Sequence, residues 1–176
     1  MRNSSARKSL AVALCLGMLM LIVAGCSSPG TKATGSVVKV GEAVNVDNLK
    51  FTVTGAETSK AVGAAGNTFE LKDGKYVVVE MDVENVGTTE TAFDGEMAKL
   101  YDADQQLYEM NLEASASCCK KETTRLKNVW FGNLQPGEKA TTRAVFEVPA
   151  GAKGLQVELR SAKIGSEKTA LVSLGI

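Results

Sequence analysis

The chain contains no histidine among its 176 residues. Histidine is the commonest general base and the commonest metal ligand, so its absence excludes Ser-His-Asp and Cys-His nucleophile machinery. It also disfavours zinc or copper bound through histidine, and we predict no cofactor. An excess of positive charge is absent as well, because 20 basic residues are balanced by 20 acidic ones. Without a basic stripe, the chain is not expected to bind nucleic acid.

The first 25 residues have the order of an export signal. Arg2, Arg7 and Lys8 come first, without any acidic residue, and a run of apolar and small residues follows over positions 10–23. As a helix this run would rise about 21 Å, which is short of the roughly 30 Å hydrocarbon core. An uncleaved membrane anchor therefore fits poorly, and a plain secretory signal is the other alternative.

Cys26 follows Ala24 and Gly25, where the apolar sequence gives way to polar residues. This junction resembles the lipobox of bacterial lipoproteins, whose cysteine becomes the lipidated first residue of the mature protein. The resemblance implies an anchor of several acyl chains on Cys26, firm enough to hold a domain on the extracytoplasmic face of the cell membrane. Residues 26–36 then form the lipidated cysteine and a small, polar, flexible tether. Ten such residues have a root-mean-square reach of about 17 Å.

Processing at Cys26 would leave 151 residues, enough for one domain with its own core. The first 25 residues hold three basic residues and no acidic one, so the remainder has 17 basic and 20 acidic residues and a formal charge of −3. Cys15 would leave with the signal and Cys26 would carry lipid. Only Cys118 and Cys119 then remain, adjacent in sequence, and a long-range disulfide framework within one chain is excluded.

From residue 37 onward, apolar and polar residues alternate, and turn residues interrupt the pattern every 8 to 12 positions. This period is typical of half-buried strands, and seven or more of them predict an all-β, antiparallel β-sandwich over residues 37–176. The residues that alternate with the inward-facing ones along each strand, including Val78 and Val145, are predicted to face outward. The inward-facing residues are Leu49, Phe51, Val53, Val77, Val79, Met81, Val83, Ala144, Phe146, Val148, Leu155, Val157, Leu159, Ala170, Val172, Leu174 and Ile176.

Several stretches occur in a suggestive order: VGEAVNVDNLKFTVTGAE, GKYVVVEMDVENVGT, KLYDADQQLY and LQPGEKATTRAVFEVPAGAKGLQVEL. Together they resemble a family of small immunoglobulin-like extracellular domains of unknown function, frequent in lipoproteins of Gram-positive bacteria. Residues 76–87 and 134–149 carry most of this resemblance, which covers about residues 37–176. It implies an immunoglobulin-like sandwich, similar to that of a secreted immunoprotective antigen, and it implies no catalytic residue.

Residues 111–128 have few large apolar side chains and no clean period. A long polar loop and a short surface helix both remain open for this segment. Because Cys118 and Cys119 lie in this least core-like stretch, we expect their loss to change the stability of the fold by less than about 1 kcal/mol.

The neighbouring cysteines are the most distinctive candidates for chemistry. A disulfide between Cys118 and Cys119 would be strained, because adjacent Cα atoms lie about 3.8 Å apart. Such a bond is easily reduced, and Lys120, Lys121 and Arg125 would lower a nearby thiol pKa. The alternatives are thiols without a role, pairing with another molecule, a catalytic thiol, or a soft metal with further ligands.

Two groups of carboxylates and one aromatic pair are weaker candidates. Asp102, Asp104 and Glu113 match positions 1, 3 and 12 of a calcium loop, but position 6 is Leu107 where glycine is required, so a hairpin turn is favoured. The second carboxylate group is Glu80, Asp82 and Glu84, which would bind a cation, pair with lysines across the sheet or form a solvated outer face. The aromatic pair is Trp130 with Phe131, which would form an exposed patch or place tryptophan in the core.

These observations predict a lipid-anchored, non-enzymatic binding or interaction module for an unknown protein or small-molecule ligand. Loops at one end of a sandwich are the usual binding site in this architecture. A thiol-redox envelope protein that uses Cys118 and Cys119 is the first alternative. A purely structural envelope protein is the second.

Overall fold

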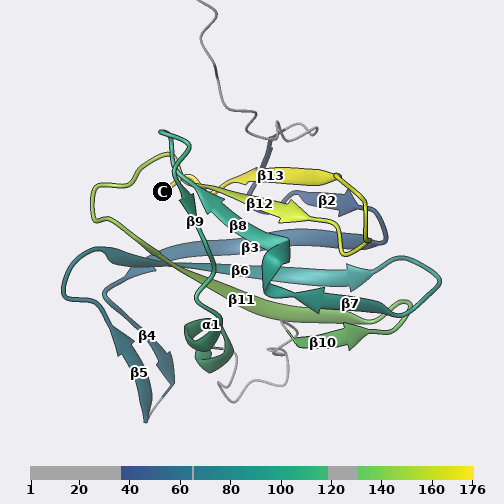
Figure 1. Ribbon diagram of the computed structural model, residues 1–176, viewed down its shortest axis with the longest axis horizontal. Helices are drawn as coiled ribbons and strands as arrows, with labels where there is room; N and C mark the ends of the chain where they lie inside the picture. Colours follow the sequence, from purple (N-terminus) through teal and green to yellow (C-terminus); the bar gives the residue numbers. More distant parts are fainter. Residues whose placement is uncertain (1–36, 65, 119–130) are drawn as a thin grey trace, which may run out of the picture. The chain divides into compact units, whose positions relative to one another are not determined.

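The computed structural model describes residues 37–64, 66–118 and 131–176, all within the compact unit Lys32–Ile176. Strands predominate, and the helical elements are the 3-10 turn η1 and the short helix α1 (Figure 1). The elements in chain order are β1 Val38–Lys39, β2 Ala43–Val46, β3 Leu49–Ser59, β4 Ala61–Ala64, β5 Asn67–Glu70, β6 Lys75–Asn85, β7 Thr91–Asp94, η1 Gly95–Met97, β8 Ala98–Tyr101, β9 Leu107–Tyr108, α1 Leu112–Cys118, β10 Phe131–Leu134, β11 Lys139–Val148, β12 Gln156–Arg160 and β13 Thr169–Ser173.

The strands form two main sheets, and the predicted β-sandwich is confirmed. One sheet has the order β11-β6-β3-β2 and the other the order β1-β13-β12-β8-β9. Two short pairs, β7 with β10 and β4 with β5, accompany them. All pairs are antiparallel except β1 with β13, where Val38 lies opposite Val172 in a parallel register. The sheets are otherwise antiparallel as predicted, and this edge pair differs because β1 joins one sheet before the chain turns into β2 of the other.

Period-two alternation places the apolar residues of both sheets in one core. Side chains from β3, β6, β8, β11, β12 and β13 pack together there, as the alternation predicts. In β6, for example, Val77, Val79, Met81 and Val83 are all fully buried. The pattern fails at Ile176, which is 40% exposed because β13 ends at Ser173.

A second, smaller apolar cluster lies on the outer face of β6 and β11. Val78 and Val145 lie opposite each other in register and are buried there, although the alternation predicted that they face outward. The helix α1 contributes Ala114 and Cys118 to the same cluster, and the β4–β5 hairpin contributes Val62. That prediction is wrong because these two elements cover this part of the outer face.

The segment 111–128, for which a loop and a short helix were both predicted as alternatives, begins with helix α1. The Asn111 side-chain oxygen accepts a hydrogen bond from the backbone amide of Ala114 at 2.9 Å, which caps the first turn. Cys118 ends the helix and is only 7% exposed. The expectation that it lies in the least core-like stretch is therefore wrong. Within the described part of the chain, no helix is long and apolar enough to span a membrane.

Candidate functional site

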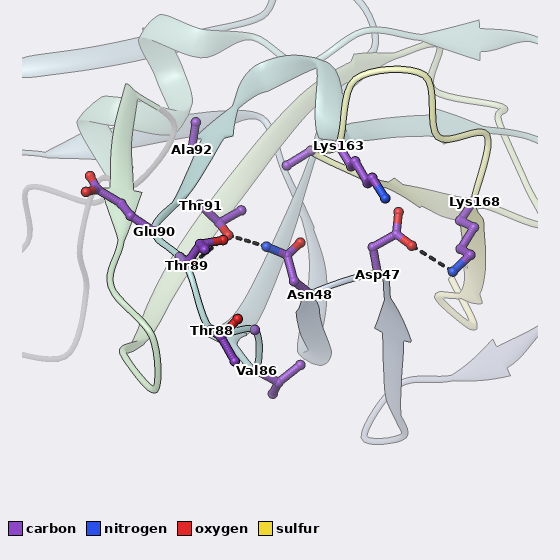
Figure 2. Close-up of a pocket in the computed structure, with 12 residues that line it drawn as sticks. Asp47, Asn48, Val86, Thr88, Thr89, Glu90, Thr91, Ala92, Lys163 and Lys168 are labelled. Carbon is purple, nitrogen blue, oxygen red and sulfur yellow. Dashed lines mark hydrogen bonds and ion pairs between the residues drawn. The ribbon is translucent and has the colours of Figure 1, made fainter.

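A cleft of about 690 Å³ opens between three connections at one end of the sandwich (Figure 2). We call this end the cleft end. The β2–β3 turn, the β6–β7 loop and the loop between β12 and β13 meet there, and the volume lies within the range usual for ligand sites. The residues that line the cleft are Asp47, Asn48, Val86, Gly87, Thr88, Thr89, Glu90, Thr91, Ala92, Ala162, Lys163 and Lys168.

Asp47 joins the β2–β3 turn to the β12–β13 loop. Its carboxylate accepts hydrogen bonds from the hydroxyls of Ser161 and Ser166, at 2.5 and 2.6 Å, and pairs with the Lys168 ammonium at 2.7 Å. These contacts, that of Lys168 first, hold the pKa of the Asp47 carboxyl well below its usual range. Asp47 has a φ of +53°, a left-handed conformation that aspartate tolerates better than most residues. We call these four residues the Asp47 network.

Asn85 shapes the opposite wall from beneath the β6–β7 loop. This buried amide donates to the carbonyls of Thr89 and Leu134, both at 2.8 Å, and accepts from the Gly87 amide at 2.9 Å. A Cβ atom on Gly87 would lie 2.7 Å from the Cβ of Asn48, so the two loops approach too closely there for any larger residue. The Asn48 amide in turn donates to the Thr91 hydroxyl, which ties the turn to the loop.

The lining of the cleft suits a polar ligand. Lys163 and Lys168 lie on either side of Asp47 in Figure 2, whereas Glu90 points away from them. Lys168 is engaged by Asp47, and within residues 37–64, 66–118 and 131–176 no salt bridge engages Lys163. Together with the threonine hydroxyls, its ammonium can bind an acidic or hydroxylated group. The described residues contain no cluster of three or more potential metal-binding side chains.

The predicted cysteine sites are not part of the cleft. Cys26 and Cys119 lie outside the described residues, so the lipid on Cys26 and the disulfide between the neighbouring cysteines stay predictions. Cys118 does not line the cleft and is buried against Val78 and Val145 in the second cluster. Reactive cysteines usually lie at partly exposed sites, so this position does not favour a thiol-redox function.

The calcium-like residues form the predicted hairpin turn, between β8 and β9. One oxygen of Asp102 accepts from the backbone amides of Asp104 and Gln106, both at 3.0 Å, and the other accepts from the Tyr108 hydroxyl at 2.8 Å. The Tyr108 bond, followed by that of Gln106, lowers the pKa of Asp102. The carboxylate therefore stabilises the turn, and Glu113 lies apart from it in α1.

The three carboxylates of β6 pair with cations across the sheet, which was one of the predicted alternatives. Glu80 accepts two hydrogen bonds from Arg143 on β11, at 2.9 and 2.8 Å. The remaining pairs are Asp82 with Lys139 at 3.0 Å and Glu84 with Lys50 at 2.5 Å. Such partly exposed pairs contribute little to stability, and these side chains form a surface ladder outside the cleft. Trp130 lies outside the described residues, and Phe131 begins β10.

The cleft residues themselves were missed at the level of sequence. In the sequence, Asp47 and Asn48 have only the character of turn residues, and no local pattern distinguishes Ser161 or Ser166. The contacts of Asp47 with these serines span 114 and 119 residues along the chain. No local pattern reports a contact over such a separation.

Comparison with known proteins gives a family without an assigned function. The family described as Domain of unknown function (DUF4352) matches residues 38–170. No curated protein matches the chain.

Solved structures share the fold at low sequence identity. The yjhA protein from Bacillus subtilis is 19% identical, with a TM-score of 0.55 over 78% of this chain and 99% of that one. An uncharacterized beta-sandwich protein from Clostridium difficile is 14% identical, with a TM-score of 0.53 over 80% and 95% of the two chains. A candidate lipoprotein of Bacillus subtilis, ycdA, is 11% identical, with a TM-score of 0.50 over 74% of this chain and 38% of that one.

Proposed function

The chain belongs to the family described as Domain of unknown function (DUF4352), and from its cleft we propose that it is a non-enzymatic binding module. A lipid on Cys26 holds this module on the outer face of the cell membrane. The observation that carries the proposal is the cleft of about 690 Å³, built by three loops that the Asp47 network and Asn85 hold in place. Ordered loops at one end of a rigid sandwich are the usual position of a binding site in this architecture.

The ligand is polar, because hydroxyls, an amide and the Lys163 ammonium line the space. The location is supported by the order of residues around Cys26, which resembles a lipobox, and by the fold that the chain shares with a candidate lipoprotein. The location and the binding activity are separate claims, so each has its own test.

The binding claim is tested by photo-crosslinking in intact cells. A benzophenone side chain in place of Thr88, which is exposed on the cleft wall, should form an adduct of defined mass. The same side chain in place of Ala150, exposed in the β11–β12 turn, is the matched control and should not form it. Identical adduct patterns at both positions would contradict a binding site in the cleft.

The location claim is tested by acyl labelling. Cys26→Ser should abolish incorporation of labelled palmitate and leave the protein unprocessed or released from the membrane. A variant that still takes up palmitate and stays on the membrane as well as the wild type would show that the lipoprotein interpretation is wrong.

A further inference from the structure

One half of β3 has a hydrogen-bonded neighbour on only one side. β3 pairs with β6 along nearly its whole length, but the much shorter β2 reaches only as far as Thr52, opposite Ala43 (Figure 1). Residues 55–59, which we call the β3 edge, are therefore an edge of the sheet within the described part of the chain. A strand edge can accept a further strand, because its outward amide and carbonyl groups lack partners.

The backbone groups of Ala56 and Thr58 point away from β6. Successive residues of a strand direct their backbone groups to opposite sides. In β3 the residues with core-facing side chains direct theirs to the β2 side, as the Val53 carbonyl does when it accepts from the Gly41 amide at 2.8 Å. Beyond the bulge that follows Val53, the residues opposite core positions of β6 are Ala56 and Thr58. Neither has a backbone hydrogen bond on this side in the structure as described for residues 37–64, 66–118 and 131–176.

A hollow of about 230 Å³ lies beside the β3 edge, on the outer face of the sheet. Gly55 opens this hollow toward the edge, since a Cβ atom on Gly55 would meet no other atom within 4 Å. A strand added at the edge would lie about 4.8 Å from β3, so one of its side chains can pass over Gly55 into the hollow. The residues that line the hollow are Gly55, Ala56, Glu57, Val78, Glu80 and Arg143.

The charge of the hollow selects a basic side chain. Arg143 already donates two hydrogen bonds to Glu80. Glu57 is exposed, and no salt bridge engages its carboxylate among the described residues. Two carboxylates against one guanidinium give the hollow a net negative charge. The stem of a lysine or arginine can lie along Val78 while its charged end reaches Glu57.

We propose that the β3 edge binds an extended segment of a partner protein that carries a lysine or arginine. The segment pairs antiparallel with β3, in line with β2, and its backbone bonds with Ala56 and Thr58. Its basic side chain enters the hollow over Gly55. Backbone pairing supplies affinity, and the hollow supplies the preference for a basic residue. This surface is separate from the cleft, because the two share no lining residue.

The same charge disfavours pairing between two copies of this chain. In the symmetric antiparallel arrangement that matches Ala56 of one copy with Thr58 of the other, the two Glu57 side chains lie directly opposite each other. Like charges at opposite positions of neighbouring strands are destabilising. Glu57 therefore guards the edge against self-association and favours a basic segment.

Hydrogen exchange of the mature protein with synthetic peptides tests the pairing. The probes are the acetylated and amidated peptide Thr-Val-Thr-Lys-Thr-Val-Thr and its variant with glutamate in place of lysine. The amides of Ala56 and Thr58 should exchange rapidly in the free protein, and the lysine peptide should slow them several-fold more than the glutamate peptide. Equal effects of the two peptides would overturn the proposal. So would amides already protected without peptide, whether at all protein concentrations or, through a second copy, only at high ones.

Methylation of peptide nitrogens tests the antiparallel register. Methyl groups on the nitrogens of the two threonines that flank lysine should abolish the protection, because these amides face β3 when lysine points into the hollow. Methyl groups on the nitrogens of the two valines should leave it unchanged, because these amides face solvent. Equal loss from both methylated peptides, or loss from the valine methylation alone, would contradict the proposed pairing.

Two substitutions test the hollow. Gly55→Val introduces no left-handed strain and no clash but obstructs the passage, so it should weaken binding of the lysine peptide several-fold. Gly151→Val, in the β11–β12 turn, is the matched control, since a Cβ atom there also meets no other atom within 4 Å. Glu57→Gln keeps the shape of the hollow and should remove the preference for the lysine peptide without changing the unfolding midpoint. A preference retained in Glu57→Gln would overturn the proposal, even if Gly55→Val failed to fold.

Discussion

The hydroxyl oxygen of Ser115 in α1 accepts a hydrogen bond from the backbone amide of Val145 in β11, at 2.9 Å. The carbonyl of the same valine accepts from the Asn111 amide at 2.8 Å, and the Ser115 hydroxyl donates to the Asn111 carbonyl at 2.6 Å. The start of α1 thus satisfies both backbone groups of Val145, where another strand would otherwise have to pair. This contact allows a helix to cover the outer face of a sheet.

Ser115→Ala should therefore lower the free energy of unfolding by about 1–3 kcal/mol, because it leaves the buried Val145 amide without an acceptor. Chemical denaturation of the mature protein measures this change. Ser173→Ala is the control, since no hydrogen bond of its side chain is seen within the described residues, and it should stay within about 0.5 kcal/mol of the wild type. Equal stabilities for the two variants would mean that α1 does not dock through Ser115.

Phe146→Ala tests the main core. This side chain is fully buried between the two sheets, and its removal should cost about 3–5 kcal/mol through lost burial and a cavity. Phe69→Ala, on the margin of the second cluster, should cost less because Phe69 is only partly buried. An unfolding midpoint for Phe146→Ala that matched the wild type would contradict the strand face assigned to it.

The core strands could be predicted because their burial follows a local rule. Alternation with period two identifies one face of each strand, as for Val79 and Met81, and a sandwich buries that face. The same rule failed for Val78 and Val145, because whether the outer face is covered depends on α1 and the β4–β5 hairpin. Nothing in the sequence near either valine announces that cover.

The candidate site was predictable only as a region, the loops at one end of the sandwich. Its construction depends on Asp47, whose serine partners are more than 100 residues away in sequence. Cys118 was expected in the least core-like stretch because its segment has few large apolar residues. Small residues such as Ala114 and Ser115 are nonetheless what permits a helix to pack closely against the sheet.

Because Cys118 is buried, we no longer expect cysteine loss to leave the stability of the fold almost unchanged. We predict instead how fast this thiol reacts. In a Cys119→Ser background, Cys118 should react with a thiol reagent much more slowly in the native protein than in denaturant, because only the unfolded state exposes it. Labelling kinetics across a denaturant series measure this difference. Rapid labelling under native conditions would show that α1 does not bury this thiol.

Asn85→Asp should destabilise the protein by about 3–5 kcal/mol, because it replaces a buried amide donor with a carboxylate that faces the carbonyls of Thr89 and Leu134. The change should also disorder the β6–β7 wall of the cleft, which hydrogen exchange of residues 86–90 would report. Asn133→Asp, at an exposed position of β10, is the matched control and should stay within about 0.5 kcal/mol of the wild type. Similar losses in both variants would argue against a special role for Asn85.

The pH dependence of stability tests the Asp47 network. Because the folded protein holds the pKa of Asp47 below its ordinary value of 3.8, the ionised carboxylate stabilises the fold above that pH. This contribution is lost as the pH falls from 3.8 through the lower pKa of the folded state. Asp47→Asn should therefore be less stable than the wild type at pH 7, and the difference should shrink as the pH drops below 3.8.

Denaturant unfolding of both proteins between pH 7 and pH 2.5 measures this difference. Glu167→Gln removes a carboxylate of the same loop outside the network, and at pH 7 it should change stability by less than about 0.5 kcal/mol. A constant offset between Asp47→Asn and the wild type over the whole range would show that the charge of Asp47 does not stabilise the loop. The same carboxylate orders the two serines that flank Ile164, so Asp47→Asn should also increase hydrogen exchange in residues 161–168 at pH 7.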